Sequence, residues 1–264
     1  MTYDRYEMMT VTRQARVLTI TLNRPKVRNA VNPQLHDELS RIFTDVDRDT
    51  EADVVILTGA GGAFSAGGDL DWLQALHGDP VATARSIQND RRIQNSLLDL
   101  EKPILAKVNG PAVGLGCSLA LFCDFVFATP ESRFADPHVA VGLVAGDGGA
   151  VIWPQLIGYA RARRYLLTGD AILGAEAAEI GLITECVAAD AIDQAVEDMA
   201  QRLAAGATHA VKWTKASINA GLKATANAVI DRAAGLENLT MLMRDHGLAL
   251  EAMRERRKPT FVGR

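Results

Sequence analysis

The 264-residue sequence has no long apolar run and no leader-like N-terminus. Its longest apolar stretches are interrupted by Asp124 or by glycines well before the roughly 18 residues that a membrane-spanning helix needs. Asp4, Arg5 and Glu7 occupy the region where a secretory signal would carry its apolar core. The sequence therefore predicts a protein that is neither secreted nor membrane-spanning and has no membrane partner.

Cysteine is scarce, and the three cysteines show no recognisable pairing. Cys117, Cys123 and Cys186 are odd in number and follow neither C-x-x-C spacing nor a Cys/His zinc pattern. The pattern excludes a disulfide framework and gives no indication of a metal site. A reducing cytoplasm is therefore the expected location.

An excess of positive charge is also missing. The 28 Lys and Arg against 32 Asp and Glu give a net charge of -4, which argues against a broad electrostatic surface for nucleic acid or anionic lipid. The rest of the composition is that of a globular protein, since 48% of the residues are hydrophobic and 23% are charged. The length predicts one large domain, or one domain with an appendage.

Strand patterns and helix patterns alternate along most of the chain. Asn32 and Pro33 form a helix start, in which an N-cap residue precedes proline at the first helical position. Such alternation predicts a largely parallel sheet and an α/β class. From about Ala188 onward the pattern is helical throughout. The expected elements are a hairpin at 7–22, helices at 33–48 and 81–100, and strands at 54–57, 104–108 and 125–128.

Two of the strands run into glycine-rich turns. Residues 54–70 read VVILTGAGGAFSAGGDL, with a helix expected to start near Gly67, and residues 104–124 read ILAKVNGPAVGLGCSLALFCD. A bend of this kind presents unpaired N–H groups at the positive end of a helix dipole, which suits an oxygen that becomes an anion. Either turn alone is more simply a tight glycine turn, but two of them can each offer one N–H to a single oxygen.

These segments resemble the oxyanion-hole segments of the crotonase superfamily, the enoyl-CoA hydratase/isomerase family. The resemblance covers most of the chain and implies a spiral of ββα units at 1–200 that contains the active site. It also implies a helical trimerisation region at 201–264, with assembly as a homotrimer or a dimer of trimers. The matching motifs are LNRPKVRNAV at 22–31, FSAGGDL at 64–70, NGPAVGLGCSLALFCD at 109–124, GLVAGDGG at 142–149 and LLTGDAILGAEAAEIGLITECV at 166–187.

The resemblance also implies where a substrate would lie. A thioester carbonyl would be held between the N–H groups of Ala66 and Leu115, and coenzyme A would enter as part of the acyl-CoA substrate, with no other cofactor. Lys258, in the segment RERRKPTF, could reach a neighbouring subunit's CoA phosphates, although a solvated basic tail explains it equally well. The other CoA-binding positions implied are Arg24, Lys26, Arg28, Ser65, Ala66, Gly68, Asp69 and Leu70.

The sequence departs from the hydratase pattern at both catalytic glutamates. Ser118 and His138 stand at these positions, and a hydroxyl cannot replace a carboxylate as a base near neutral pH. We expect Ser118 to bond to its own helix backbone. His138 is the best candidate base because imidazole titrates near neutrality, and Asp147, nine residues later, is its expected partner. The simpler alternative is a loop histidine and an aspartate that caps a helix.

The spacing of His138 and Asp147 is similar to that in the 6-oxocamphor hydrolase branch, which cleaves carbon–carbon bonds in β-diketones. That branch uses a further histidine in the second turn, where this chain has Leu115, so a CoA thioester is the expected substrate. The leading prediction is an enzyme of the enoyl-CoA hydratase type. The alternatives are retro-Claisen hydrolysis of a β-keto acyl-CoA, enoyl-CoA isomerisation, and a non-catalytic CoA-ester binder. RNA binding is disfavoured by the acidic balance.

The remaining histidines and tryptophans are given ordinary roles. Surface or packing roles are expected for His36, His77, His209 and His246. Trp72, Trp153 and Trp213 are expected to be core or interface anchors, although Trp72 and Trp153 lie close enough in sequence to the two site segments to line an acyl pocket.

Overall fold

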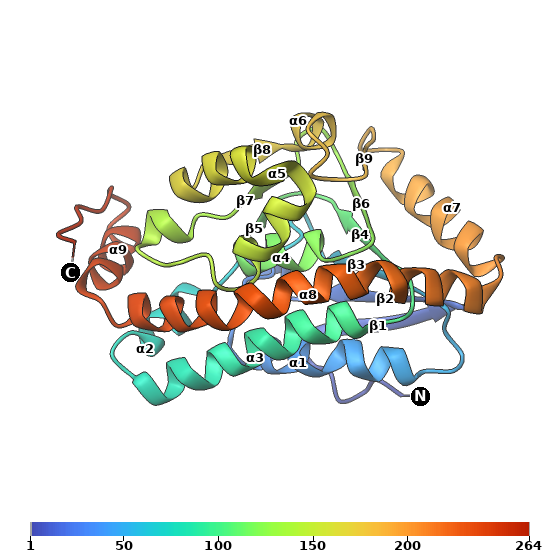
Figure 1. Cartoon of the computed structure of the whole chain (residues 1–264), viewed down its shortest axis with the longest axis horizontal. Coiled ribbons are helices and arrows are strands. Elements are labelled where there is room, and N and C mark those ends of the chain that lie inside the picture. The colour runs from blue at the N-terminus through green and yellow to red at the C-terminus, as the bar shows by residue number, and fades with distance from the viewer. Residues whose placement is uncertain (1, 264) are drawn as a thin grey trace.

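The main sheet has six strands in the order β1-β2-β3-β4-β6-β9. The structure, a computed structural model, describes residues 2–263. β1 pairs antiparallel with β2, as the predicted hairpin requires, and every later pair in this sheet is parallel (Figure 1). The α/β class is therefore confirmed. The strands are β1 (Met9–Gln14), β2 (Val17–Leu22), β3 (Val54–Gly59), β4 (Ile104–Val108), β6 (Phe125–Ala128) and β9 (Glu185–Cys186).

Both faces of this sheet are covered, which explains why β3 is apolar along its length. Val55 and Leu57 point into the larger core, whereas Val54 and Ile56 pack with Val196 of α7 (Ile192–Ala204) on the other face. Side chains alternate between the two faces of a strand, so a parallel strand buried on both sides reads as a continuous apolar run.

Three long helices form a layer over the larger core: α1 (Pro33–Arg48), α3 (Pro80–Asp99) and α8 (Thr208–Met241). Figure 1 shows α8 running along almost the whole molecule, with α3 beside it. Asn32 caps α1 by accepting from the N–H of Leu35 at 2.9 Å, as predicted. The short helix α2 (Leu70–Leu76) packs against the final helix α9 (Arg244–Arg254).

A second, three-stranded sheet holds the remaining strands, in the order β5-β7-β8. It consists of β5 (Ala112–Val113), β7 (Arg133–Ala135) and β8 (Ala171–Leu173). The connecting elements are η1 (Pro25–Val27), α4 (Leu115–Leu121), η2 (His138–Val141), α5 (Gly149–Thr168) and α6 (Gly174–Glu179). α5 is broken at Gly158, whose φ of +75° is not helical.

Two sequence-based boundaries differ from the structure. The helix expected near Gly67 begins at Leu70, because Asp69 is its N-cap and accepts from the N–H of Asp71 at 3.2 Å. The division between residues 200 and 201 falls inside α7, a helix that packs on the main sheet. The C-terminal region is helical from α7 onward, as predicted.

Within residues 2–263, no helix is both long enough and apolar enough to cross a membrane. All three cysteines are unpaired, and Cys117 and Cys123 are buried.

Candidate active site

Two glycine-containing turns lie against each other beyond β3 and β4. A parallel bridge joins Ser65 to Ala112, and the N–H of Ser65 donates to the carbonyl of Pro111 at 3.0 Å. Gly67 has a φ of +82°, and a Cβ on it would lie 2.7 Å from the carbonyl oxygen of Val113. Only glycine permits both this conformation and this approach of two backbones. The repeated glycines of the sequence therefore bring the two turns together.

The first turn offers a free N–H at Gly68 rather than at Ala66. The Ala66 N–H, predicted as an oxyanion donor, donates to the Arg28 carbonyl at 2.9 Å. Gly68 forms a parallel bridge with Val31. The two hydrogen bonds of this bridge join Val31 to Gly67 and Asp69, the neighbours of Gly68, so the N–H of Gly68 points away from Val31. No described residue accepts that N–H. The prediction of Ala66 is wrong because Gly67, with its positive φ, turns the chain between the two groups.

The second turn offers the N–H of Leu115, as predicted. Leu115 is the first residue of α4, so this N–H has no acceptor inside the helix, and none of residues 2–263 accepts it outside the helix. A Cβ on the preceding Gly114 would lie 3.7 Å from Cε1 of His138 and 4.0 Å from Cα of Gly67. The Leu115 N–H therefore lies beside both the first turn and His138.

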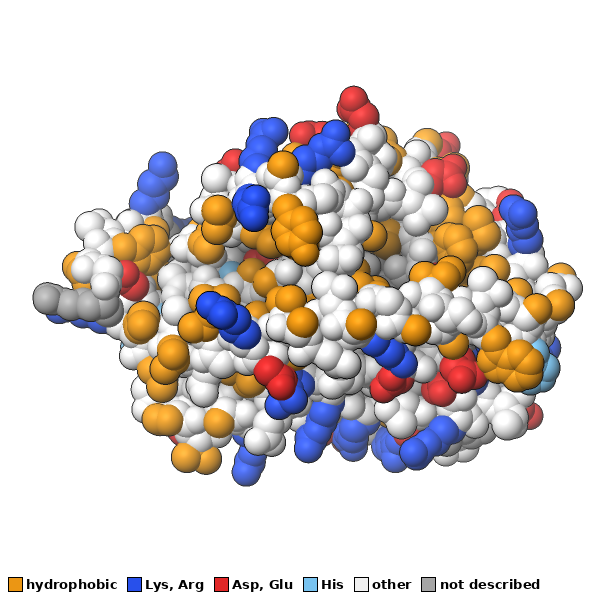
Figure 2. All heavy atoms as spheres, in the orientation of Figure 1, with side chains coloured by type: hydrophobic (Ala, Val, Ile, Leu, Met, Phe, Trp, Pro, Cys, Tyr) orange, Lys and Arg blue, Asp and Glu red, His pale blue; other side chains and the backbone are white. Residues whose placement is uncertain are grey.

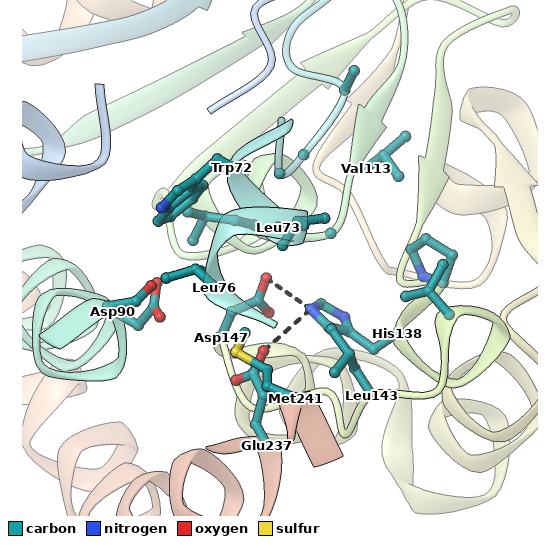
Figure 3. A pocket seen from close by; sticks show the side chains of 18 of the residues that line it. Trp72, Leu73, Leu76, Asp90, Val113, His138, Leu143, Asp147, Glu237 and Met241 are labelled. Atoms are coloured by element: carbon teal, nitrogen blue, oxygen red, sulfur yellow. Dashed lines mark ion pairs between the residues drawn. The ribbon is translucent and has the colours of Figure 1, made fainter. Parts of the chain in front are cut away.

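A cavity of about 160 Å³ opens in front of the turns, and its lining includes Gly68, Leu115 and His138. Figure 3 shows Trp72 and Leu76 on one side and His138 on the other. Trp72 lines this cavity, whereas Trp153 is fully buried and packs against Tyr165 in the core.

His138 lies between two aspartates, and the nearer one is not the predicted partner. Its Nδ1 lies 2.5 Å from Oδ1 of Asp136, while its Nε2 faces Oδ2 of Asp147 at 3.3 Å. Asp136 therefore orients the ring, and Asp147 faces the nitrogen on the other side. Asp136 was missed as a partner because only Asp147 was weighed, although a residue two positions away is within reach.

The sequence predicted that the Ser118 hydroxyl bonds to its own helix backbone, and this prediction is wrong. Its Oγ donates to Oδ1 of Asp147 at 3.0 Å, and both side chains are buried. Gly148 makes room for this contact, since a Cβ on it would lie 3.3 Å from Cβ of Ser118. Ser118, at a position where the hydratase pattern has a glutamate, thus holds the carboxylate of Asp147, which comes from another loop.

Glu237 of α8 completes the cluster and was not predicted. Its Oε1 lies 3.8 Å from Nε2 of His138, and its other oxygen, Oε2, is buried without a partner among the described residues. Figure 3 shows Glu237 and Asp147 converging on the same ring nitrogen. A signal existed in the sequence: in the C-terminal half of α8 the buried residues are small or apolar except for Glu237. They are Ala226, Ile230, Ala233, Ala234, Glu237 and Met241, whereas the N-terminal half buries Lys215 and Asn219.

The environment of the cluster shifts the pKa values of His138, Glu237 and Asp147 in different directions. Burial lowers the pKa of His138, but the charges of Asp147 and Asp136 outweigh burial and raise it well above its ordinary value. Burial and the neighbouring carboxylates raise the pKa of Glu237 well above its ordinary value. Burial raises the pKa of Asp147, but the charge of His138 and the hydrogen bonds that Asp147 accepts outweigh burial and hold this pKa below its ordinary value. These directions favour an imidazolium, an ionised Asp147 and a protonated Glu237 in the same cluster.

Asp136, His138 and Asp147 also have the composition of a cation site. Each carboxylate already faces one nitrogen of the imidazole that they share, at 2.5 Å and 3.3 Å. Both ring nitrogens that such an ion would need are therefore already engaged by the two carboxyl groups.

The predicted CoA-binding residues fall into two groups. Arg24 pairs with Asp69 at 3.2 Å, and the Oγ of the fully buried Ser65 donates to the Asn29 carbonyl at 2.8 Å, so these side chains hold the first turn in place. Ala66 and Leu70 belong to the same segment and are half-buried, whereas the exposed residues are Lys26, Arg28, Gly68 and Lys258.

The basic C-terminal segment begins close to the first turn. Arg254, at the end of α9, pairs with Asp71 of α2 at 2.8 Å. Because Asp69 caps the same helix, residues 254–258 leave α9 near the positions expected to contact CoA.

Comparison with known proteins shows the family and the fold of the chain. The enoyl-CoA hydratase/isomerase family model matches residues 12–264. Crotonyl-CoA hydratase of Syntrophomonas wolfei is 31% identical over 98% of this chain and 99% of its own length. The crystal structure of an enoyl-CoA hydratase/isomerase from Mycobacterium paratuberculosis superposes with a TM-score of 0.90 at 36% identity, covering 92% of this chain and 97% of that one.

A beta-diketone hydrolase from the cyanobacterium Anabaena also superposes, with a TM-score of 0.85 at 27% identity, over 90% of this chain and 96% of that one. The chain thus has the crotonase fold, and it belongs to the enoyl-CoA hydratase/isomerase family.

Proposed function

We propose that this protein is an acyl-CoA enzyme of the enoyl-CoA hydratase type, with a catalytic cluster unlike the usual pair of glutamates. The observation that carries the proposal is that two unpaired N–H groups, of Gly68 and Leu115, line the same cavity as an acid and a base. A thioester oxygen bound by both N–H groups is stabilised as it gains negative charge. Relatives named as crotonyl-CoA and short-chain-enoyl-CoA hydratases support this reaction class.

The opposite pKa shifts of Asp147 and Glu237 assign the proton transfers. As the oxygen of water bonds to the β-carbon, its acidity rises steeply, so even the ionised Asp147 can accept its proton. The electron pair of the double bond moves onto the thioester oxygen, and the enolate then takes a proton at the α-carbon from neutral Glu237. His138, already protonated, holds both carboxyl groups in place and relays the proton between them. This replaces the role of His138 as the base, which the sequence suggested.

Hydrolysis of a β-keto acyl-CoA is the second candidate. The same cluster can direct water to a ketone carbonyl, after which the carbon–carbon bond breaks and the thioester enolate leaves. The likeness to a beta-diketone hydrolase favours this candidate. Isomerisation would need only the proton transfers through Glu237 and Asp147.

CoA binding and self-association complete the proposal. Exposed Lys26, Arg28 and Lys258 supply positive charge for the phosphates, and the proposed steps use only protein groups. An apolar groove of about 590 Å³ between α5, α7 and α8 has exposed Ile218 on its rim, and Figure 2 shows hydrophobic side chains along this face. We assign this face to a homotrimer or dimer of trimers. The unpaired cysteines suit a cytoplasmic location.

The experiment is a substrate screen with product identification. Purified protein is incubated with 2-enoyl-CoA esters of several lengths and with cyclic β-keto acyl-CoA esters, and products are identified by mass spectrometry. Gain of one water without chain cleavage supports hydration, whereas ring opening supports hydrolysis. Absence of turnover on every ester, with His138→Ala behaving the same, would leave the binder hypothesis as the better explanation.

A further inference from the structure

A further acidic group, outside the catalytic cluster, lines the cavity. Asp90 of α3 is 6% exposed, and Figure 3 shows it on the opposite side of the cavity from His138. Its Oδ1 accepts from Nε2 of His36 at 2.7 Å. Its Oδ2 has no partner among the described residues, and this oxygen belongs to a side chain that lines the cavity.

His36 holds Asp90 in one position. His36 is 2% exposed, on the buried face of α1, and its ring packs on Trp72 with 4.8 Å between the ring centroids. The surface or packing role expected for His36 from the sequence therefore becomes a specific one. A hydrogen bond from a buried imidazole fixes one carboxylate oxygen and leaves the other directed elsewhere.

Ser86 lies one helical turn before Asp90 and lines the same cavity. It is 6% exposed, and no described residue bonds to its hydroxyl. Residues four apart on a helix are neighbours, about 5–6 Å apart at their Cβ atoms. The first buried residues of α3 are polar except for Ile87, whereas those from Ile93 onward are apolar except for Gln94. The first group is Thr83, Ser86, Ile87 and Asp90, and the second is Ile93, Gln94, Leu97 and Leu98.

A carboxylate with an unpaired oxygen beside apolar residues such as Leu76 and Met241 is unfavourable unless something binds it. Asp90 is neither an oxyanion donor nor a proton carrier in the proposed steps, although its charge is one of those that raise the pKa of Glu237. The unused oxygen of Asp90 and the hydroxyl of Ser86 together offer an acceptor and a group that both donates and accepts. A ligand hydroxyl matches this pair, whereas an ammonium could not accept from Ser86 and would cost more to desolvate.

We propose that Ser86 and Asp90 bind a hydroxyl group at the distal end of the acyl moiety, so that the preferred substrates are hydroxylated acyl-CoA thioesters. This inference rests on the proposed function, because it assumes that the cavity holds the acyl part of a CoA ester. The hydroxyl in question is remote from the double bond and is distinct from the one that hydration would create.

The test measures binding of unreactive esters, so that it does not depend on turnover. Calorimetry compares saturated medium-chain acyl-CoA esters that carry a hydroxyl at successive carbons, from the γ-carbon to the chain end, with their unsubstituted parents. We expect at least one positional isomer to bind about 10- to 100-fold more tightly than its parent. An ω-amino ester should show no such gain.

Three variants locate the effect. Asp90→Asn keeps the shape and an acceptor for His36, and Ser86→Ala removes only a hydroxyl; each should reduce the preference to a few-fold. Asp99→Asn, on the exposed end of the same helix, is the matched control and should retain the full preference. Retained binding of the parent ester reports that each variant is folded.

The outcomes separate this inference from the proposed function. If no hydroxylated isomer binds more than about 2-fold better than its parent, or if the preference survives both Asp90→Asn and Ser86→Ala, the inference is overturned, whatever the enzyme does to enoyl esters. If esters bind with the expected preference but none is turned over, the reaction class fails and the distal hydroxyl site stands.

Discussion

Oε1 of Glu237 lies 3.8 Å from Nε2 of His138, although one residue comes from α8 and the other from η2 beside the second sheet. A Cβ on Gly146 would lie within 3 Å of the Glu237 side chain, so the glycine loop leaves space for this carboxyl group. The long C-terminal helix therefore supplies a functional group as well as packing surface. Truncation of α8 would remove the proposed acid from the site.

Glu237→Gln should separate proton transfer from binding. The amide keeps the size and neutrality of the proposed acid but has no proton to give, so kcat should fall by about 10²- to 10⁴-fold while the affinity for a saturated acyl-CoA changes little. Stopped-flow turnover and calorimetry on the same preparations measure the two effects. Near-normal kcat in this variant would remove Glu237 from the mechanism.

The raised pKa of His138 makes a prediction about pH and activity. A histidine acting as a free base would make the rate rise through about pH 6.5. Because His138 is already protonated and Glu237 is already neutral at that pH, we expect kcat to be level there and to decline at higher pH, as these groups lose their protons. A rate that climbs through neutrality would restore His138 as the base.

The raised pKa of His138 should also make the free energy of unfolding depend on pH. A folded-state pKa above the unfolded value means that the contribution of His138 is complete below about pH 6.5 and is lost as pH rises through the folded pKa. Urea unfolding of wild type and His138→Asn across this range gives the difference that belongs to His138. The low pKa of Asp147 acts only in acid, so it adds no slope here. The raised pKa of Glu237 adds a slope of the same sign, so only the difference between wild type and His138→Asn is assigned to His138.

Much of the fold could be predicted because its signals are local. Asn32 and Pro33 mark the start of α1, and alternation of strands and helices predicts the parallel sheet. The turns at 64–69 and 110–116 could also be predicted, since glycine is needed where two backbones approach too closely for a Cβ, as at Gly67. Helix starts and tight turns of this kind are determined by residues that are adjacent in the sequence.

The donors and carboxyl groups of the site were harder to assign because direction and distance in space decide them. Ala66 and Gly68 differ only in which way an N–H points after Gly67, and no sequence spacing records that. Glu237 reaches His138 through the packing of α8 on the core. Family resemblance pointed to the two turns but could not supply the hydrogen-bond partner of each atom.

Gly149→Ala should damage the catalytic cluster from outside the cavity. A Cβ at Gly149 would lie 1.8 Å from Oδ2 of Asp136, so Asp136 must move away from His138. We expect a loss of about 1–3 kcal/mol in unfolding free energy, together with a lower kcat. Gly62→Ala is the matched control, since nothing lies within 4 Å of a Cβ there and it should be nearly neutral. Equal behaviour of the two variants would contradict this account of the glycine loop.

Ile218→Glu should disrupt the proposed assembly. Ile218 is 69% exposed in the single chain and borders the apolar groove formed with α5 and α7. Light scattering of the wild type should report a trimer or hexamer, and a charge at this position should shift it toward smaller species. Ser217→Glu, on the exposed part of the same helix, serves as the control for added charge. A monomeric wild type at micromolar concentration would rule out the assembly.

Leu115→Pro tests the second oxyanion donor with little disturbance of the fold. Leu115 occupies the first position of α4, where proline is tolerated because the N–H has no helical partner, and the preceding Gly114 adapts readily to a following proline. The substitution deletes the N–H, whereas the control Leu115→Ala shortens the side chain and keeps the donor. Loss of one such donor should lower kcat by about 10²- to 10³-fold in Leu115→Pro, beyond any effect shared with Leu115→Ala. Equal activity of the two variants would show that the Leu115 N–H does not hold the substrate oxygen, and Gly68 would then lack the second donor that the mechanism requires.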